Sequence, residues 1–264
     1  DAMQTVRAPA VAGLFYPADT AELHAQVQRF LDQIEPPAEA PPKAIIAPHA
    51  GYVYSGPVAA SAYARLKAAR DIIARVVLLG PSHRVGFRGI AASGMIAFET
   101  PLGRIPVDRE AVELARQLPD VGFLEQAHAQ EHSLEVHLPF LQEVLGEFKL
   151  VPLVVGEARP QQVGMVLEAL WGGPETLIVI SSDLSHYQDY QTAQRMDRET
   201  SRAIEALRFE DIGYEQACGR NPVNGLLWVA RRKNLHVETI DLRNSGDTAG
   251  PRDQVVGYGA YVCH

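Results

Sequence analysis

The chain has few cysteines, no long apolar run and no excess of positive charge. Its two cysteines, Cys218 and Cys263, lie far apart and outside any Cys-x-x-Cys motif. This pattern disfavours a disulfide-rich scaffold and favours a reduced cytoplasmic setting, although a single disulfide between them stays open. The formal net charge is -8 and the basic residues are scattered, which disfavours nucleic acid and anionic membranes as partners. No apolar stretch approaches the roughly 18 residues of a membrane span.

Several common motifs are also missing. The first residues contain no signal-peptide core, because Pro9 and Asp19 interrupt their mild hydrophobicity. Asp1 and Ala2 precede Met3, and we expect these two residues to be left over from cloning rather than part of the natural sequence. No Walker A motif is present, and the glycines of 257–259 precede an expected strand rather than a helix. The sequence therefore gives no sign of a nucleotide-binding enzyme.

The pattern of apolar segments predicts one α/β domain over residues 1–264. Apolar residues make up 47% of the chain, enough for a sizeable core. After Pro42, expected strands alternate with expected helices, which predicts a sandwich of helices around a mainly parallel central sheet. Strands are expected at 44–47, 76–79, 150–155, 177–180, 237–242 and 255–262, and a hairpin at 96–107 that turns near Gly103; helices are expected from about residue 20 and at 109–118, 138–145, 161–170, 193–207 and 222–232.

Three histidines each follow one of the buried strands. His49, His83 and His186 come two to six residues after apolar runs that lack the alternation of a half-exposed strand. Open α/β sheets bind ligands beyond the carboxyl ends of their strands, so we expect these imidazoles to share one cleft. Imidazole is a common metal ligand and proton carrier near neutral pH. The alternative is that each is a loop histidine bonded to backbone.

Asp183 lies three residues before His186, a spacing that places both on one face of a helical turn. A carboxylate that accepts an imidazole N–H fixes the tautomer and raises the basicity of the other nitrogen. In the alternative interpretation, Asp183 or a neighbouring serine caps a helix. A serine hydrolase is disfavoured because no G-x-S-x-G motif is present.

Two further features are candidates for a metal site, the first as supporting residues and the second as a ligand. His132 and His137 are five residues apart, which does not match the four-residue spacing of H-E-x-x-H, so we expect them to support a metal site rather than to bind the ion. Cys218 precedes Asn221 and Pro222, a helix-start signature, and lies beside an arginine. That setting favours a thiolate and hence metal binding, whereas the alternative is a buried, inert cysteine. Cys263, in an apolar terminal strand, is interpreted as structural.

These segments, in this order, resemble the Memo family, whose bacterial and archaeal members are also called AmmeMemoRadiSam system protein B. The resemblance runs from about Val6 to Val262. The matching stretches are 12–17, 47–56, 80–83, 99–103, 131–139, 181–187 and 218–222.

The Memo family is similar in fold to class III extradiol ring-cleaving dioxygenases, which hold Fe(II) with two histidines and a carboxylate. The resemblance implies that His49 and His83 are metal ligands and that Cys218 takes the place of the carboxylate. It implies that His186 is the acid/base histidine, with Asp183 beside it. Because thiolate is softer than carboxylate, it shifts the expected metal toward copper, zinc or a differently tuned iron.

The family motifs also bring Phe15, Tyr16 and Tyr54 together as an expected aromatic pocket wall. For Phe15 and Tyr16, ordinary core packing is the alternative. Memo relatives are linked to peptide binding in eukaryotes, and to a radical SAM protein and an AMMECR-type protein in bacteria. Small molecules or peptides are therefore the expected partners.

Three functions stay open from the sequence. The first is a metal-dependent redox enzyme that uses iron or copper on an unidentified substrate. The second is a non-enzymatic metal- or peptide-binding protein on a dioxygenase-like fold. The third is a zinc hydrolase in which His49, His83 and Cys218 leave a fourth position for water. Cys218 speaks against a standard extradiol oxygenase, whereas Asp183 and His186 speak against an inert scaffold.

Overall fold

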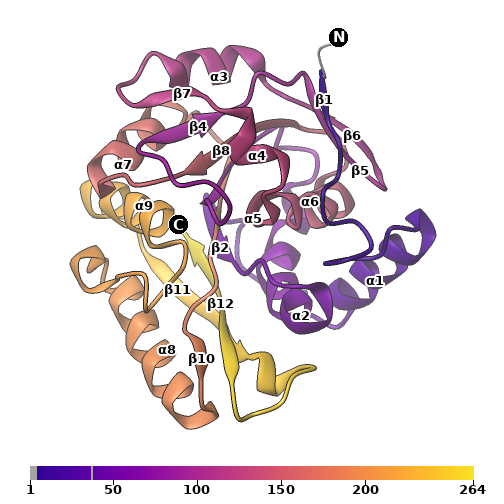
Figure 1. The fold of residues 1–264 in the computed structure, drawn as a ribbon, viewed down its shortest axis with the longest axis vertical. Coiled ribbons are helices and arrows are strands. Elements are labelled where there is room, and N and C mark those ends of the chain that lie inside the picture. Colours follow the sequence, from indigo (N-terminus) through magenta and orange to yellow (C-terminus); the bar gives the residue numbers. More distant parts are fainter. Residues whose placement is uncertain (1–4, 37) are drawn as a thin grey trace.

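A nine-stranded sheet runs through the middle of the computed structural model, which describes residues 5–36 and 38–264 (Figure 1). Asp1 and Ala2 lie outside the described residues. The strands follow one another across the sheet in the order β10 (His186–Gln188), β12 (Val255–Cys263), β2 (Ala44–Ala47), β9 (Thr176–Ser181), β3 (Arg75–Pro81), β8 (Lys149–Val155), β4 (Ile90–Ala92) and β7 (Val121–Phe123). β11 (Val237–Asn244) pairs with β12.

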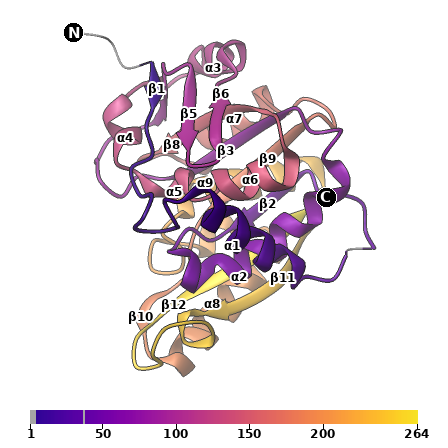
Figure 2. The same ribbon diagram turned by 90° about the vertical axis from the view of Figure 1, so that its right-hand side faces the viewer.

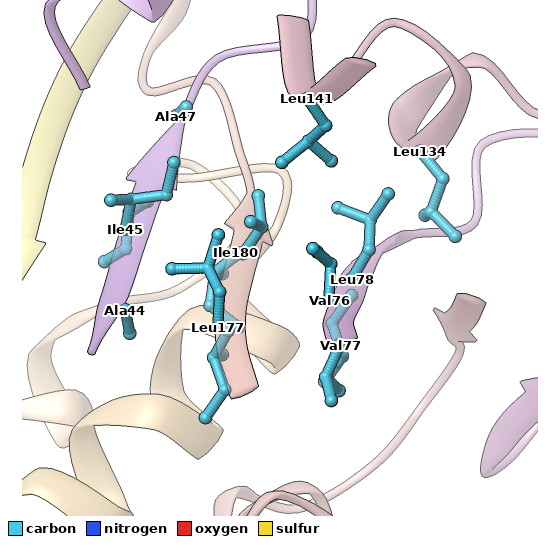
Figure 3. Close-up of a cluster of buried hydrophobic side chains, with 14 of the residues drawn as sticks. Ala44, Ile45, Ala47, Val76, Val77, Leu78, Leu134, Leu141, Leu177 and Ile180 are labelled. Carbon is cyan, nitrogen blue, oxygen red and sulfur yellow. The ribbon is translucent and has the colours of Figure 1, made fainter. Parts of the chain in front are cut away.

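The centre of this sheet is parallel and its flanks are mixed. β2, β9, β3 and β8 are parallel neighbours, as are β4 and β7. β12 runs antiparallel to β2, and β4 runs antiparallel to β8. The central strands are buried along nearly their whole length, as the unbroken apolar runs predict, and Figure 3 shows side chains of β2, β9 and β3 gathered in one buried cluster. The prediction of a mainly parallel sheet therefore holds for the centre and for the β4–β7 pair, but not for the other flanking pairs.

Helices cover both faces of the sheet, as Figures 1 and 2 show. One face carries α1 (Thr20–Asp32), α2 (Tyr52–Tyr63), α5 (His132–Glu135) and α6 (Leu138–Leu145). The other carries α7 (Pro160–Ala169), α8 (Tyr190–Glu205) and α9 (Arg220–Lys233). α3 (Arg109–Arg116) and α4 (Glu125–Ala129) lie near β7 and β4, and short 3-10 helices occupy 64–69, 209–211 and 245–247. None of the described helices is long and apolar enough to cross a membrane.

A second sheet of three strands lies beside the first. It joins β1 (Val6–Arg7), β5 (Ala97–Thr100) and β6 (Gly103–Pro106), and its strand β6 contacts β8. β5 and β6 form the predicted hairpin, and Gly103 has a φ of 128°, which favours glycine at this turn. β1 was not predicted, because a two-residue strand carries no periodic signal.

A buried ion pair ties β1 to the large sheet's helices. The Arg7 guanidinium donates to Glu135 Oε1 at 2.5 Å and to the carbonyls of His128 and Glu131. Both side chains are almost fully buried. Glu135 also accepts hydrogen bonds from the Tyr16 hydroxyl and from two backbone amides of residues 10 and 11. The network is fully satisfied, and it fixes the N-terminal segment against α5.

We expect His128 to make the protein less stable in mild acid. Burial and the charge of Arg7 outweigh a hydrogen bond to the Ala91 carbonyl and lower the pKa of His128 to about 4. An unfolded histidine has a pKa of about 6.5, so below that pH the unfolded state binds a proton that the folded state excludes. The free energy of unfolding should therefore fall as the pH drops from about 6.5 toward about 4, and this residue should contribute about 2 kcal/mol of that loss by pH 5.

Urea unfolding of the protein and of His128→Gln at pH 7 and pH 5 measures this contribution. The variant should be less stable at pH 7 but should lose less stability on acidification. Equal losses in both proteins would assign the acid sensitivity to other groups.

Candidate metal centre

Three histidines meet at the carboxyl ends of the central parallel strands. His49 follows the last residue of β2 by two positions, and His83 follows the last residue of β3 by two. His132 is the first residue of α5, which packs against β3. One ring nitrogen from each of the three lies within 4.8 Å of the others. The sequence placed His49 and His83 at this edge correctly, but it gave His132 only a supporting role.

The three rings also pack against one another. His83 and His132 are stacked with ring centroids 4.5 Å apart, and His49 meets both edge-on at 5.1 and 5.3 Å. His49 is buried, His132 is half-buried and His83 is the most exposed of the three. Solvent therefore reaches the cluster from the side of His83.

A chain of hydrogen bonds fixes the tautomer of His49. The Ser181 hydroxyl donates its single proton to the Ser133 carbonyl, so it can only accept from the two imidazoles beside it. His49 Nδ1 therefore donates to Ser181 Oγ at 2.7 Å, and His137 Nε2 donates to the same oxygen at 2.8 Å. The Tyr63 hydroxyl completes the chain by donating to His137 Nδ1. This arrangement leaves the His49 Nε2 lone pair free to bind a ligand.

Glu131 orients His83 in a similar way. Its carboxylate accepts from His83 Nδ1 at 2.8 Å, from the His83 backbone amide and from the Ser133 amide. Burial raises the pKa of Glu131, but the hydrogen bonds from His83 and Ser133 outweigh it, and the net pKa is lowered. A charged carboxylate that accepts Nδ1–H leaves Nε2 of His83 as the ligating nitrogen.

The cluster fits a transition-metal ion. Burial, and then the neighbouring imidazoles, lower the pKa of His49 and bring that of His132 to about 4, so both are neutral near pH 7. Nitrogens bound to one ion at about 2.1 Å lie no more than about 4.2 Å apart, so small ring rotations suffice to close the cluster onto one ion. Neutral imidazoles suit iron, copper and zinc.

Cys218 joins this cluster through His49, whose Nε2 lies 3.3 Å from the Cys218 sulfur. Burial, followed by the nearby Asp183 carboxylate, raises the pKa of the thiol to about 12. Hydrogen bonds from the Ser182 side chain and from the backbone of Asp183 and Gly219 lower this pKa by less than burial raises it, so the sequence-based expectation of a thiolate is wrong for the metal-free protein. Cys263 is buried in β12, in line with its interpretation as structural, and both cysteines are free.

Asp183 bonds to His49 rather than to His186. Its carboxylate accepts from the His49 backbone amide at 2.8 Å and lies 3.7 Å from His49 Nε2. Residues 182–185 form a loop, and His186 begins β10, so the helical turn expected for this pair is absent. Burial raises the pKa of Asp183 to about 7. His186 is half-buried, and burial together with the charge of His83 lowers its pKa.

The three aromatics expected to form a pocket wall differ in their surroundings. The Phe15 ring lies 4.5 Å from that of His132, beside the cluster. Tyr16 is buried in the core, with its ring 5.6 Å from that of Tyr52, so its expected place on a pocket wall is wrong. Tyr54 is 41% exposed near the start of α2.

The sequence did not single out Glu131, Ser181 or Tyr63 as supporting residues. Glu131 directly precedes His132, and Ser181 ends the strand that runs between the strands before His49 and His83. These positions are the features of the sequence from which supporting roles for Glu131 and Ser181 could have been predicted. Tyr63 lies at the end of α2, which was not predicted, so nothing in the sequence pointed to it.

Replacing Glu131 with glutamine should lower the metal affinity by about 10- to 100-fold, the usual effect of removing an outer partner of a ligating histidine. The amide cannot carry the charge that favours the N–H···O bond from His83. Competition with a chromogenic chelator measures the change. Glu125→Gln is the control, because Glu125 accepts from Ser93 and Gly94 rather than from these rings. Unchanged affinity in Glu131→Gln would show that His83 binds no ion.

The fold and this cluster define a mixed α/β protein with a candidate metal centre at the carboxyl edge of its central strands. A model of the Memo-like protein family matches residues 7–262, and the chain belongs to that family. A protein described as a MEMO1 family protein from Aquifex aeolicus is 39% identical over 266 residues, which cover 96% of this chain and 97% of that protein. A MEMO1 family protein from Thermotoga sp. is 37% identical, and one from Saccharolobus solfataricus is 32% identical, each with the same coverage.

A solved structure of an uncharacterized protein, JW3007 from Escherichia coli K12, is also similar. It is 14% identical, with a TM-score of 0.48, over 81% of this chain and 98% of that one.

Proposed function

We propose that this chain is a metal-dependent oxidoreductase that holds one transition-metal ion at His49, His83 and His132. The observation that carries the proposal is the convergence of three ring nitrogens within 4.8 Å, two of them with tautomers fixed by hydrogen bonds. The proposed fold class is that of the class III extradiol dioxygenases. The substrate is proposed to be an unidentified small molecule or peptide, with the protein in the cytoplasm and a radical SAM or AMMECR-type protein as its partner.

Iron or copper is the proposed metal. A bound redox metal would supply one-electron chemistry and an open position for a substrate. The Cys218 sulfur, 3.3 Å from His49, is placed to add a soft ligand once a metal displaces its proton. In this proposal Cys218 completes the set, and its high pKa in the metal-free protein makes metal binding release a proton.

Asp183 and His186 are proposed to handle protons. Asp183 lies beside His49, and its raised pKa of about 7 lets it be protonated or ionised near neutral pH. His186 is half-buried and close enough for the charge of His83 to lower its pKa. His186→Ala should then leave the metal content intact while it abolishes turnover.

Zinc hydrolysis is the second candidate, and the third imidazole favours it. Three histidines with one open position are a known catalytic zinc set. His132 supplies that third nitrogen without any need for the thiol.

Metal analysis of protein purified without oxygen, followed by reconstitution with Fe(II), Cu(I) or Zn(II), tests the proposal. One ion of iron or copper per chain, together with oxygen uptake in a substrate screen, is expected. The His49→Ala/His83→Ala variant should lose that ion, whereas His236→Ala, which changes an exposed histidine in another part of the fold, should keep it. Tight zinc with no oxygen uptake would favour the hydrolase, and weak binding of all three metals would refute both.

A further inference from the structure

A buried carboxylate on α8 lies outside the cluster of histidines and has no counter-charge. Asp197 is 2% exposed and is the one charged side chain among the buried residues of that helix. Within residues 5–36 and 38–264, no lysine, arginine or histidine nitrogen lies within 4.0 Å of its carboxylate. Burial raises its pKa to about 6, so it is still mostly ionised at pH 7. Burying an unpaired carboxylate costs free energy, which other contacts must offset.

The contacts of this carboxylate converge on Ser185. Asp197 Oδ1 accepts a hydrogen bond from the Ser185 backbone amide at 3.0 Å. The Ser185 hydroxyl is buried, and no other group among the described residues bonds to it. Because that hydroxyl lowers the pKa of Asp197, it lies beside the same carboxylate. Ser185 belongs to the loop of residues 182–185 between β9 and β10, so Asp197 fixes one point of this loop.

Gly257 of β12 holds the same point of the loop from another side. A Cβ atom at this position would lie 1.9 Å from Asp197 Oδ2, so only glycine lets the carboxylate come this close. The Gly257 amide donates to the Ser185 carbonyl, and the Gly257 carbonyl accepts from the Leu184 amide, each at 2.8 Å. Both backbone groups of Ser185 are thus bonded, its amide to α8 and its carbonyl to β12. We call Asp197, Ser185 and Gly257 the clamp.

The clamp lies between the two residues that are proposed to handle protons. Asp183, two residues before Ser185, accepts from the His49 amide at 2.8 Å. His186 follows Ser185 directly and begins β10. Tyr187 then has a φ of 62°, which costs free energy in a non-glycine residue and persists only where its surroundings fix it. The clamp therefore sets where the loop enters β10 and where both side chains of the pair lie.

We propose that Asp197 is the positioning residue for the pair of Asp183 and His186. The inference rests on the proposed function, which gives that pair its role in moving protons. In the part of the chain that the structure describes, Asp197 makes no hydrogen bond to either side chain or to a candidate metal ligand. It acts through the backbone of Ser185, which joins the two. Loss of the carboxylate should free the loop, so that His186 samples more than one position.

Amide hydrogen exchange and histidine NMR of the metal-free, full-length protein test the clamp at pH 7. In Asp197→Ala, the Ser185 amide should exchange at least about tenfold faster, because a hydrogen bond to an ionised acceptor is worth about that factor or more. The His186 ring resonances, identified by their absence in His186→Ala, should shift or broaden. Asp197→Asn keeps an oxygen that accepts from the Ser185 amide, so it should restore both readouts most of the way to those of the parent.

Two further variants distinguish positioning of the loop from general loosening of α8. Gly257→Ala keeps the carboxylate but displaces it, so it should reproduce the effects of Asp197→Ala. Ser201→Ala removes a buried hydrogen bond between the Ser201 and Tyr261 hydroxyls, which joins α8 to β12 one helical turn away. That variant should leave both readouts as in the parent. Thermal melts of every variant establish that it is folded.

The outcomes separate this inference from the proposed function. Zn(II) affinity, measured by chelator competition, should be the same in Asp197→Ala as in the parent, because the clamp contains no ligand. Unchanged exchange and ring resonances in Asp197→Ala, equal changes in Ser201→Ala, or a loss of zinc affinity in Asp197→Ala would each overturn the positioning role. A parent protein that binds no metal but shows the expected exchange and NMR changes would instead refute the proposed metal function, with Asp197 still the residue that positions the loop.

Discussion

Replacing His132 with alanine should weaken metal binding by at least about 100-fold, because the loss of a ligand exceeds the 10- to 100-fold effect of losing an outer partner. The prediction rests on the ring nitrogen of His132, which lies within 4.8 Å of those of His49 and His83. Chelator competition with Fe(II), Cu(I) and Zn(II) measures the affinity. His236→Ala, in an exposed loop position, should leave it unchanged.

The metal affinity of Cys218→Ser, measured in the same way, distinguishes a set of three histidine ligands from a set of two histidines and one cysteine. A neutral hydroxyl replaces a potential soft ligand, so affinity should fall by at least about tenfold, and most strongly for Cu(I). If His132 binds the ion, His132→Ala has the larger effect for Zn(II). Retained affinity in His132→Ala together with complete loss in Cys218→Ser would instead establish the two-histidine, one-cysteine set that the family resemblance implied.

The fold was most predictable where apolar runs are long and regular. The strands at 44–47 and 177–180, and the helix at 138–145, lie where the pattern placed them, because burial on defined faces leaves a periodic signal. α2 was not predicted because Gly56 and Pro57 interrupt its sequence, yet tertiary packing buries most of it. The antiparallel flanks were also missed, because apolar strands do not reveal the direction of their neighbours.

The candidate site was predictable in its position but only partly in its chemistry. His49 and His83 follow parallel neighbours of β9, so strand topology brings them together. His132 enters from a helix of four residues, and only the tertiary fold stacks its ring on that of His83. The pKa of Cys218 depends on burial, which the local sequence does not reveal. Its position near a helix start therefore led to the incorrect expectation of a thiolate.

The buried pair of Arg7 and Glu135 should be the most sensitive point for stability outside the core. Glu135→Ala leaves the Arg7 guanidinium buried without a counter-charge and removes the acceptor of the Tyr16 hydroxyl. Breaking such a pair typically costs about 3–5 kcal/mol, and urea unfolding measures the loss. Because α5 spans only His132–Glu135, the same variant should also weaken metal binding.

The double variant Arg7→Met/Glu135→Leu separates the cost of an orphaned charge from the value of the pair itself. Since two buried charges lose most of their attraction to desolvation, replacing both with apolar groups should recover most of the stability lost in Glu135→Ala. The matched surface pair is Arg116 with Glu113, which is 59% exposed; Glu113→Ala should change the free energy of unfolding by less than about 1 kcal/mol. If the double variant is as unstable as Glu135→Ala, the loss comes instead from the amides of residues 10 and 11 and the tyrosine hydroxyl that Glu135 satisfies. In that case Glu135 acts mainly as a hydrogen-bond acceptor that anchors the N-terminal segment beside His132.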